Sequence, residues 1–379
     1  MNRVYIGRIL GVFLASLLIY LGIAWWVLAP LGYYGTRERP RFADPWIARA
    51  ETILHGGRLY EDVFTSTPPL MNYLLIPPVI VSGWFGHQNP WATLAFMIYY
   101  SLFNLFVAYT LFFTASDRAE GYHWALLYLA NPLTFGNTVL RRQDESVSVF
   151  FFALALLFVL HNRHWRSSIV MGLSLLVKLT GGMLIPVAFL ETRKWQYLII
   201  PFAVFGMIFA PFLLTAGRSA VFWDINQEHT EHPFQFGGVS LGALWLKWRG
   251  SNVESILRVY SLVFVIGVVL VLGYIALRPK GMWVDFTLLV AAVLLLSPKL
   301  HCGYFSILVL AMTPLVRPYR LGSFYFTFAV CALIADMYKW PVEHFPAAFW
   351  GMVAVYVVLI GALLWLYRAL RRARLESLS

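Results

Sequence analysis

The sequence predicts an all-α fold, built as a polytopic bundle of transmembrane helices. Hydrophobic residues make up 60% of the 379 residues and charged residues only 12%, and the mean hydropathy is +0.69. Apolar segments of roughly 20 residues, the length that a helix needs to cross the hydrocarbon, recur along the chain. A helix satisfies its own backbone hydrogen bonds in lipid, and the sequence lacks the alternating strands of a membrane barrel. We expect a single domain over residues 1–379.

About ten full spans are expected, some of them shorter than an ideal span. The first apolar run is long enough to cross the membrane and lacks a small-residue cleavage site, which favours an uncleaved first helix over a removable signal peptide. The expected spans lie near residues 9–33, 91–114, 123–140, 146–161, 197–214, 253–277, 282–297, 304–316, 321–337 and 346–367.

Two long polar segments connect spans on the external side. The first external loop covers residues 34–90, and within it residues 69–86 are interrupted by prolines. Proline removes a backbone donor and breaks helices, so we expect short helices lying in the outer interface rather than a span. The second large external loop covers residues 215–252.

Residues 168–190 form an apolar segment that is interrupted by Lys178, Gly181 and Gly182. Basic residues flank this segment at both ends. A re-entrant hairpin of two half-helices returns both basic flanks to the same side of the membrane, in agreement with the positive-inside rule. We therefore predict a hairpin rather than another full span.

The distribution of charge orients the bundle. With both chain ends and the short basic turns placed inside, basic residues outnumber acidic ones there, whereas the two signs balance in the external segments. This assigns both termini to the cytoplasm. The net charge of +11 is spread over short turns, so we expect contacts with membrane lipids and no nucleic-acid partner. Cys302 and Cys331 give neither a disulfide framework nor a zinc spacing.

Four polar motifs follow one another along the chain. The acid Asp44 precedes AETILHGGRLYEDVFTSTPPL, the turn RRQDE occupies residues 141–145, Lys178 precedes a Gly-Gly break and a proline, and SPKLHCGYF begins at Ser297. In this order they resemble the GT-C superfamily of integral-membrane glycosyltransferases, and the similarity runs from the first span to about residue 310.

The resemblance implies transfer of a mannose-like hexose, with inversion, from a dolichyl- or polyprenyl-phosphate-linked donor. The acceptor would be a hydroxyl of a glycan, lipid or protein at the external or luminal face. A carboxylate would act as the base, and cationic groups would stabilise the departing phosphate. Many members carry D-x-D in the first loop, whereas here Asp44 is followed by Pro45 and Trp46. The residues therefore indicate no metal site, and no cofactor is expected, although a divalent metal is compatible with the family.

Asp44 is the first candidate for the catalytic base, because the resemblance points to it and because it follows the first span. A structural interpretation stays open beside it, since aspartate followed by proline is an ordinary helix start. Glu51 lies seven residues later, about two helical turns along the same face. It is a candidate on the acceptor side, or a residue of a solvated face.

The turn at 141–145 contributes candidates of both signs. Asp144 is the second catalytic candidate, to position the acceptor or assist the base, and Glu145 is an acceptor-side candidate. Arg141 and Arg142 are candidate phosphate ligands. In the structural alternative, the acids cap a helix and the arginines are local counter-ions.

Lys178 is a candidate ligand of the donor phosphate, because an ammonium within a hydrophobic segment tends to face a cavity or a counter-ion. Snorkelling, or pairing with backbone carbonyls freed at the Gly-Gly break, is the structural alternative. Lys299, His301 and Tyr304 share one external turn and are assigned to phosphate or donor contacts. His301 is expected to act as a hydrogen-bond donor rather than as a metal ligand.

His229 and His232 are acceptor-side candidates in the second external loop. Their E-H-x-x-H order differs from the helical HExxH pattern of zinc proteases. A flexible polar loop over the site is therefore expected in preference to a metal centre.

Two other classes of function stay open. A transporter or flippase of lipid-linked saccharides would share the hydrophobicity, the broken helices and the intramembrane lysine, but the sequence has no visible internal repeat. A structural subunit of a membrane complex would not need this ordered series of acids and cations. The expected location is the cell membrane, or the endoplasmic reticulum membrane if the protein is eukaryotic.

Overall fold

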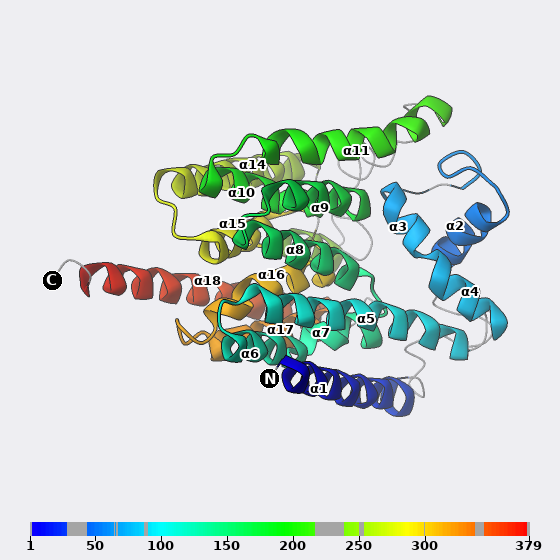
Figure 1. Cartoon of the computed structure of the whole chain (residues 1–379), viewed down its shortest axis with the longest axis horizontal. Coiled ribbons are helices and arrows are strands. Elements are labelled where there is room, and N and C mark those ends of the chain that lie inside the picture. Colours follow the sequence, from blue (N-terminus) through cyan, green and yellow to red (C-terminus); the bar gives the residue numbers. More distant parts are fainter. Residues whose placement is uncertain are drawn as a thin grey trace. The chain divides into compact units, whose positions relative to one another are not determined.

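The computed structural model describes nine stretches of the chain. They are residues 2–28, 44–63, 65, 67–86, 90–216, 239–249, 254–298, 300–337 and 345–376. Within these stretches the chain is helical and contains no β-sheet (Figure 1), so the predicted all-α class is confirmed. The chain divides into two compact units, 1–130 with 134–231 and 131–133 with 232–379. The expectation of one domain over the whole chain stays a prediction.

The first unit carries the N-terminal helices and the first external loop. Its elements are α1 (Asn2–Ile23), η1 (Ala24–Leu28), α2 (Asp44–Leu54), α3 (Pro69–Leu74), α4 (Ile76–Trp84), α5 (Pro90–Thr114), α6 (Arg118–Ala130), η2 (Gly136–Leu140), α8 (Glu145–Leu160), α9 (His164–Val177), η3 (Leu179–Met183), α10 (Leu184–Thr192) and α11 (Gln196–Thr215). The short helix α7 (Pro132–Phe135) lies at the boundary between the units along the chain.

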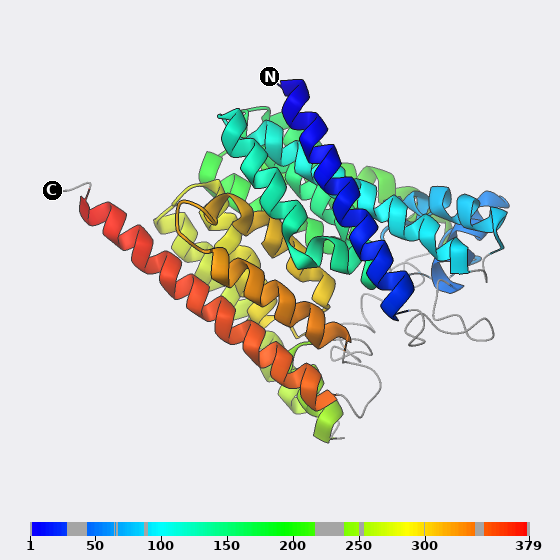
Figure 2. The same cartoon turned by 90° about the horizontal axis from the view of Figure 1, so that it is seen from below.

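The second unit carries the C-terminal helices. Its elements are α13 (Leu241–Arg249), α14 (Glu254–Leu277), α15 (Met282–Leu296), η5 (Cys302–Tyr304), α16 (Phe305–Met312), η6 (Thr313–Leu315), α17 (Gly322–Met337) and α18 (Phe345–Glu376). Helices α17 and α18 run antiparallel side by side (Figure 2). Small residues permit this approach, because Gly351 faces Ala335 and Gly361 faces Phe324.

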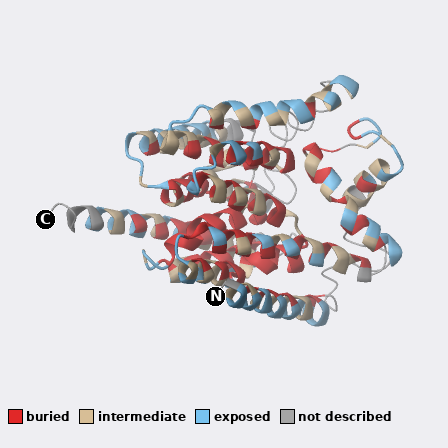
Figure 3. Cartoon of the chain, in the orientation of Figure 1, coloured by how far each residue is buried: buried red, intermediate tan, exposed pale blue. Residues whose placement is uncertain are grey.

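Among the residues that the structure describes, five helical segments are long and apolar enough to cross a membrane. They are Arg3–Leu28, Ala92–Thr114, Gln196–Thr215, Val259–Leu277 and Pro346–Arg372, and shorter apolar helices cover most of the remaining expected spans. In the first unit, large apolar side chains are exposed along α1 and α11, whereas α8 and α9 are mostly buried (Figure 3). In the second unit, they are exposed along α14 and α18, whereas α15 and α16 are mostly buried. Exposed apolar faces on these helices suit lipid, rather than water, as the surrounding solvent.

The expected span at 123–140 is wrong as one continuous helix. Helix α6 begins earlier, at Arg118, and ends at Ala130; two short pieces, α7 and η2, follow it. The break precedes Pro132, whose ring and missing amide hydrogen interrupt a helix. The average hydropathy of the segment hides this one residue.

The π-helical turn η2 is held against α5 by buried polar groups. Asn104 of α5 donates from Nδ2 to the carbonyl oxygen of Thr134 at 2.9 Å and to Oγ1 of Thr138 at 3.2 Å. It accepts a hydrogen bond from Tyr128 Oη at 2.9 Å, and Ser101 Oγ lies 3.1 Å from Thr138 Oγ1. Buried polar groups that satisfy one another specify a single packing arrangement. The network therefore fixes where the turn that follows η2 begins.

The chain reverses direction at Lys178, as the hairpin prediction requires. Lys178 is extended, with φ −159° and ψ 137°, between α9 and η3. Beyond it, Gly181 packs directly on the backbone of Ser174. At the base of the hairpin, Nδ1 of His164 lies 2.8 Å from Oη of Tyr197, so the residues before and after the hairpin are neighbours.

The two external loops contain helices. Residues 69–86 form α3 and α4, as the Pro-rich pattern predicts. In the second loop the structure has a helix, α13, where the sequence led us to expect only irregular chain; residues 217–238 and 250–252 of that loop lie outside the described residues. Trp245 and Trp248 of α13 both pack on Phe349 of α18, with ring centroids 5.9 and 5.6 Å apart. Helix α13 therefore owes its order to this tertiary contact.

Candidate functional site

Four parts of the first unit meet in one apolar cluster. The cluster consists of the buried residues Ala50, Met71, Leu75, Val79, Phe96, Tyr100, Val147 and Val177. Three of its members stand beside polar candidates in the chain: Ala50 beside Glu51, Val147 two residues after Glu145, and Val177 beside Lys178. Packing of these apolar residues therefore brings the first external loop, the 141–145 turn and the hairpin tip together.

Lys178 forms an ion pair with both acids of the turn. Its Nζ lies 3.0 Å from Oε1 of Glu145 and 3.4 Å from Oδ1 of Asp144. The Lys178 side chain is 25% exposed, the Asp144 side chain 14% and the Glu145 side chain 4%. This lysine therefore faces counter-ions, which is one of the two surroundings that its intramembrane position predicts.

The turn itself is built by backbone hydrogen bonds at the end of η2. The amide of Arg141 donates to the carbonyl of Gly136 at 2.9 Å, and the amide of Gln143 donates to the carbonyl of Asn137 at 2.8 Å. Arg142 adopts a left-handed conformation with φ 56°, which is uncommon for a residue other than glycine. The chain thereby changes direction before α8 begins.

Asp144 stands at the N-cap position of α8 but makes no side-chain capping bond. Its carboxylate turns to Lys178 instead, so the capping interpretation does not describe this acid. Burial raises the pKa of the Asp144 carboxyl, the Lys178 ammonium opposes the increase, and the neighbouring Glu145 carboxylate adds to it. A carboxylate with a raised pKa is a better general base at neutral pH than an ordinary aspartate.

Both arginines of the turn are buried in this unit, at 8% exposure for Arg141 and 3% for Arg142. Nη1 of Arg141 donates to Oδ1 of Asn137 at 2.9 Å, and Nη1 of Arg142 donates to Oγ1 of Thr93 at 3.1 Å. The charge of Arg141 also acts on Glu145. The turn therefore carries two guanidinium groups and two carboxylates within five residues, and the hairpin tip adds the Lys178 ammonium.

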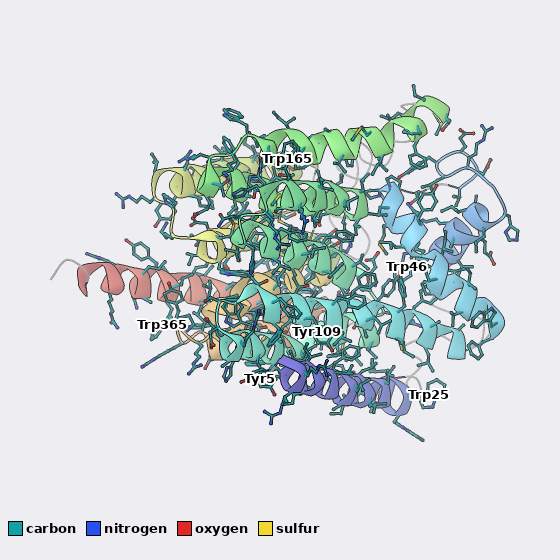
Figure 4. The ribbon with its side chains drawn as sticks, in the orientation of Figure 1. Tyr5, Trp25, Trp46, Tyr109, Trp165 and Trp365 are labelled. Atoms are coloured by element: carbon teal, nitrogen blue, oxygen red, sulfur yellow. The ribbon has the colours of Figure 1, made fainter. Side chains whose placement is uncertain are left out.

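Helix α2 leans on the same cluster through Trp46, which is labelled in Figure 4. The Trp46 ring packs edge-on against Tyr100 of α5, with centroids 5.6 Å apart, and lies 6.0 Å from Phe96. Asp44 is the first residue of α2, two positions before this contact, and its side chain lies outside the described residues. The first turn of α2 is thus held against α5 through Trp46.

Thr67 ties the first external loop to α2. Its Oγ1 accepts a hydrogen bond from Nη1 of Arg49 at 2.9 Å. Its carbonyl oxygen accepts one from Oη of Tyr60 at 2.8 Å and another from Nδ2 of Asn72 at 2.9 Å. Burial raises the pKa of the Tyr60 hydroxyl, which keeps this donor protonated. Because Arg49 belongs to α2, this junction sets how the helix lies over the apolar cluster.

The remaining predicted site residues are not part of the ion cluster formed by Lys178, Asp144 and Glu145. Glu51 lies on α2, where its seven-residue spacing from Asp44 places both on one helical face. His301 and Tyr304 belong to the second unit, where their rings pack with centroids 5.6 Å apart. Lys299, His229 and His232 lie outside the described residues. Within the described stretches, His, Cys, Asp and Glu form no group of three that is suited to hold a metal ion.

Three residues of this site were not among the sequence candidates: Tyr100, Arg49 and Thr67. Tyr100 lies within an expected span, where a tyrosine is indistinguishable from other aromatic residues of the membrane. Arg49 and Thr67 are 18 residues apart in the first external loop, and only the folded structure shows that they form a hydrogen bond. In the sequence, only the polar composition of that loop indicates that it contributes to a site.

A model of a known protein family matches most of the chain region that carries these residues. A sequence model described as glycosyltransferase family 87 matches residues 64–298, more than half of the chain. The match includes the 141–145 turn and Lys178, but it begins after Asp44 and ends before His301. No curated protein matches the sequence significantly.

The fold is similar to that of ArnT from Cupriavidus metallidurans, whose crystal structure was determined with undecaprenyl phosphate bound. The TM-score is 0.51 with 15% sequence identity, and the similarity covers 96% of this chain and 77% of the ArnT chain. At this level of identity the likeness concerns the fold, and it agrees with the GT-C resemblance of the sequence motifs.

Proposed function

The chain belongs to glycosyltransferase family 87 and is an integral-membrane glycosyltransferase of the GT-C superfamily, and from this premise we propose that it transfers a hexose from a polyprenyl-phosphate-linked donor to an acceptor hydroxyl. The undecaprenyl phosphate in the ArnT structure supports a lipid phosphate as the donor's carrier. The proposed hexose is mannose-like, and the acceptor is a glycan, a lipid or a protein. We place the reaction at the external face of the cell membrane.

One displacement accounts for the chemistry. The acceptor oxygen attacks the anomeric carbon and forms the new glycosidic bond, while the bond from that carbon to the phosphate oxygen breaks. The acceptor proton passes to a carboxylate, for which we propose Asp44, with Asp144 assisting. The polyprenyl phosphate leaves with the bonding electron pair, and the configuration at the anomeric carbon inverts.

The cations of the turn and the hairpin suit the leaving group. Charge grows on the phosphate as the bond breaks, and fixed positive groups stabilise such charge best where water is scarce. Lys178, Arg141 and Arg142 supply these groups, the two arginines with little exposure. An ammonium has three donor hydrogens, so Lys178 can contact its carboxylates and a phosphate oxygen together.

The observation that carries this proposal is the ion cluster formed by Lys178, Asp144 and Glu145. It stands where α8 begins and at the tip of the hairpin. The helix that begins with Asp44 packs on the same apolar cluster. The start of α2 and the ion cluster are thus joined by one apolar cluster, which supports a site for a lipid-phosphate donor at this end of the first unit.

The test is transfer of radiolabelled mannose from mannosyl polyprenyl phosphate by the purified protein in lipid nanodiscs, with an alkyl mannoside as acceptor. The wild type should produce a labelled glycoside, and Asp44→Asn should reduce kcat by about 100-fold or more, the usual contribution of a general base. Asp62→Asn changes an exposed acid of the same loop and should leave the rate unaltered.

A wild-type protein that moves the labelled lipid between leaflets without releasing its sugar would be a flippase, and the proposal would then be wrong. Transfer that survives intact in Asp44→Asn would retain the glycosyltransferase but remove Asp44 as its base. Assays with glucosyl and galactosyl polyprenyl phosphates decide which hexose is used.

A further inference from the structure

We propose that Tyr100 is a specificity-determining residue of the donor site, whose hydroxyl binds a hydroxyl group of the transferred sugar together with the second carboxylate oxygen of Glu145. This inference rests on the proposed function. It adds a recognition element that neither the sequence motifs nor the family comparison supplies.

Among the described residues, the Tyr100 hydroxyl is an unsatisfied polar group. The residue is fully buried in α5, and its Oη has no hydrogen-bond partner among the described residues. A buried polar group without a partner is unfavourable, because it has lost its water and gained nothing in return. Phenylalanine would fill the same space without this cost, so the hydroxyl calls for an explanation.

Glu145 also has a buried oxygen atom without a hydrogen-bond partner among the described residues. Its Oε1 accepts from Lys178 at 3.0 Å, whereas its Oε2 is buried and has no partner among the described residues. Asp144, Glu145 and Arg49 are the charged groups that act on Tyr100 electrostatically. Tyr100 also shares the apolar cluster with Val147 and Val177, so it lies on the side of α5 that faces α8 and the hairpin tip.

Tyr100 is held in place by residues of α2, α5 and α8. Ser146 of α8 donates from Oγ to the Tyr100 carbonyl oxygen at 2.8 Å. The rings of Trp46 and Tyr99 pack edge-on against its ring, each with centroids 5.6 Å away. A side chain fixed from α2, α5 and α8 offers its hydroxyl in one orientation, which is what recognition of a single substrate group requires.

The chemistry of the pair selects the ligand. Tyr100 Oη can donate a hydrogen bond, and the ionised Glu145 Oε2 can only accept one. An alcohol both accepts and donates, so one sugar hydroxyl satisfies both atoms. A phosphate oxygen would instead be repelled by the carboxylate, which assigns this pair to the sugar and leaves the phosphate to the basic residues.

The experiment compares wild type, Tyr100→Phe and Tyr99→Phe with mannosyl polyprenyl phosphate and its 2-, 3-, 4- and 6-deoxy analogues. In the wild type, one deoxy analogue should react with kcat/KM about tenfold below the parent donor, the effect of one hydrogen bond to a charged site. Tyr100→Phe should lose about tenfold on the parent donor and nothing further on that analogue. Tyr99→Phe removes the neighbouring hydroxyl and should behave as wild type.

Thermal unfolding without substrate provides the second readout. If the hydroxyl is reserved for a ligand, Tyr100→Phe should keep or raise Tm, since it removes an unsatisfied group. A clear fall in Tm with a uniform loss on all donors would mean a structural role and would overturn the inference. Equal kcat/KM values in Tyr100→Phe and Tyr99→Phe would overturn it as well.

Failure of the proposed function has a different signature. If the wild type transfers no sugar from any of these donors, binding is measured by the increase in Tm on adding mannosyl polyprenyl phosphate. A smaller increase in Tyr100→Phe than in Tyr99→Phe would then still support the contact, and equal increases would refute it.

Discussion

Lys178 is the residue on which the charge balance of the site depends. Its ammonium contacts two carboxylates that are mostly withdrawn from solvent and offsets one of their two negative charges. Removing one partner of such a group leaves buried charge uncompensated, which costs far more than the pair itself is worth.

Lys178→Met should therefore destabilise the protein by about 3 kcal/mol, seen as a lower midpoint in thermal unfolding, and should abolish sugar transfer. Lys194→Met removes an exposed lysine near the hairpin base and should change neither. Adding Glu145→Gln to Lys178→Met removes the more buried carboxylate charge and should restore part of the stability. A Lys178→Met protein as stable as wild type would show that the ion pair is unimportant.

Thr67 matters as the acceptor that fixes α2. Thr67→Val keeps the shape of the side chain but removes the oxygen that binds Arg49, so kcat should fall by roughly tenfold while Tm changes little. Thr67→Ser retains the oxygen and should keep most of the wild-type rate. Equal rates in the two variants would contradict a positioning role for this hydrogen bond.

The hairpin formed by α9, η3 and α10 is the element that brings Lys178 to the site. Its close return depends on Gly181, where any Cβ would collide with the backbone of Ser174. Backbone cannot move aside as the end of a flexible side chain can, so even one methyl group there overpacks the turn.

Gly181→Ala should cost about 1–3 kcal/mol of stability and reduce transfer by displacing Lys178. Gly206→Ala is the matched control, because a Cβ at Gly206 of α11 meets no atom within 4 Å. The measurements are Tm and the initial rate of transfer for both variants. If Gly181→Ala and Gly206→Ala give the same values, the close packing at Gly181 does not contribute to stability or activity.

Elements were predictable from sequence where one physical signal dominated. The hairpin is predicted by Lys178 within an apolar segment and by the Gly-Gly step after it. Helices α3 and α4 are predicted by the Pro-Pro steps. The break at Pro132 was missed because the surrounding residues are apolar on both sides. Helix α13 was missed because it packs on Phe349, which lies 104 residues after Trp245 in the chain.

The site was predictable residue by residue but not as an arrangement. Acids and cations stand out in a hydrophobic chain, so Asp144, Glu145 and Lys178 were found. Their pairing was not, because 33 residues separate Glu145 from Lys178 and no periodicity links an interhelical turn to a hairpin tip. Tyr100 was hidden for the opposite reason, since nothing distinguishes its hydroxyl until its surroundings are known.

At the scale of the whole molecule, topology connects fold and function. Both basic flanks of the hairpin should lie in the cytoplasm, and the first external loop on the opposite side. In a variant with Cys302 and Cys331 replaced by alanine, single cysteines at Asn162, Lys194 and Glu61 report the side of each exposed position.

A membrane-impermeant maleimide applied to intact cells should label Glu61→Cys, whereas Asn162→Cys and Lys194→Cys should react only after the membrane is permeabilised. Labelling of Asn162→Cys and Lys194→Cys from opposite sides would mean that residues 164–192 cross the membrane. The hairpin could not then hold Lys178 at the face where α2 begins.

The most direct test of the account is a cryo-EM structure of the protein in nanodiscs with mannosyl polyprenyl phosphate and the inactive Asp44→Asn substitution. We expect the phosphate within hydrogen-bonding reach of Lys178, Arg141 or Arg142, and the sugar between residue 44 and the ion cluster. A lipid phosphate bound away from all three cations, or a sugar on the opposite side of the membrane from α2, would contradict the proposed site.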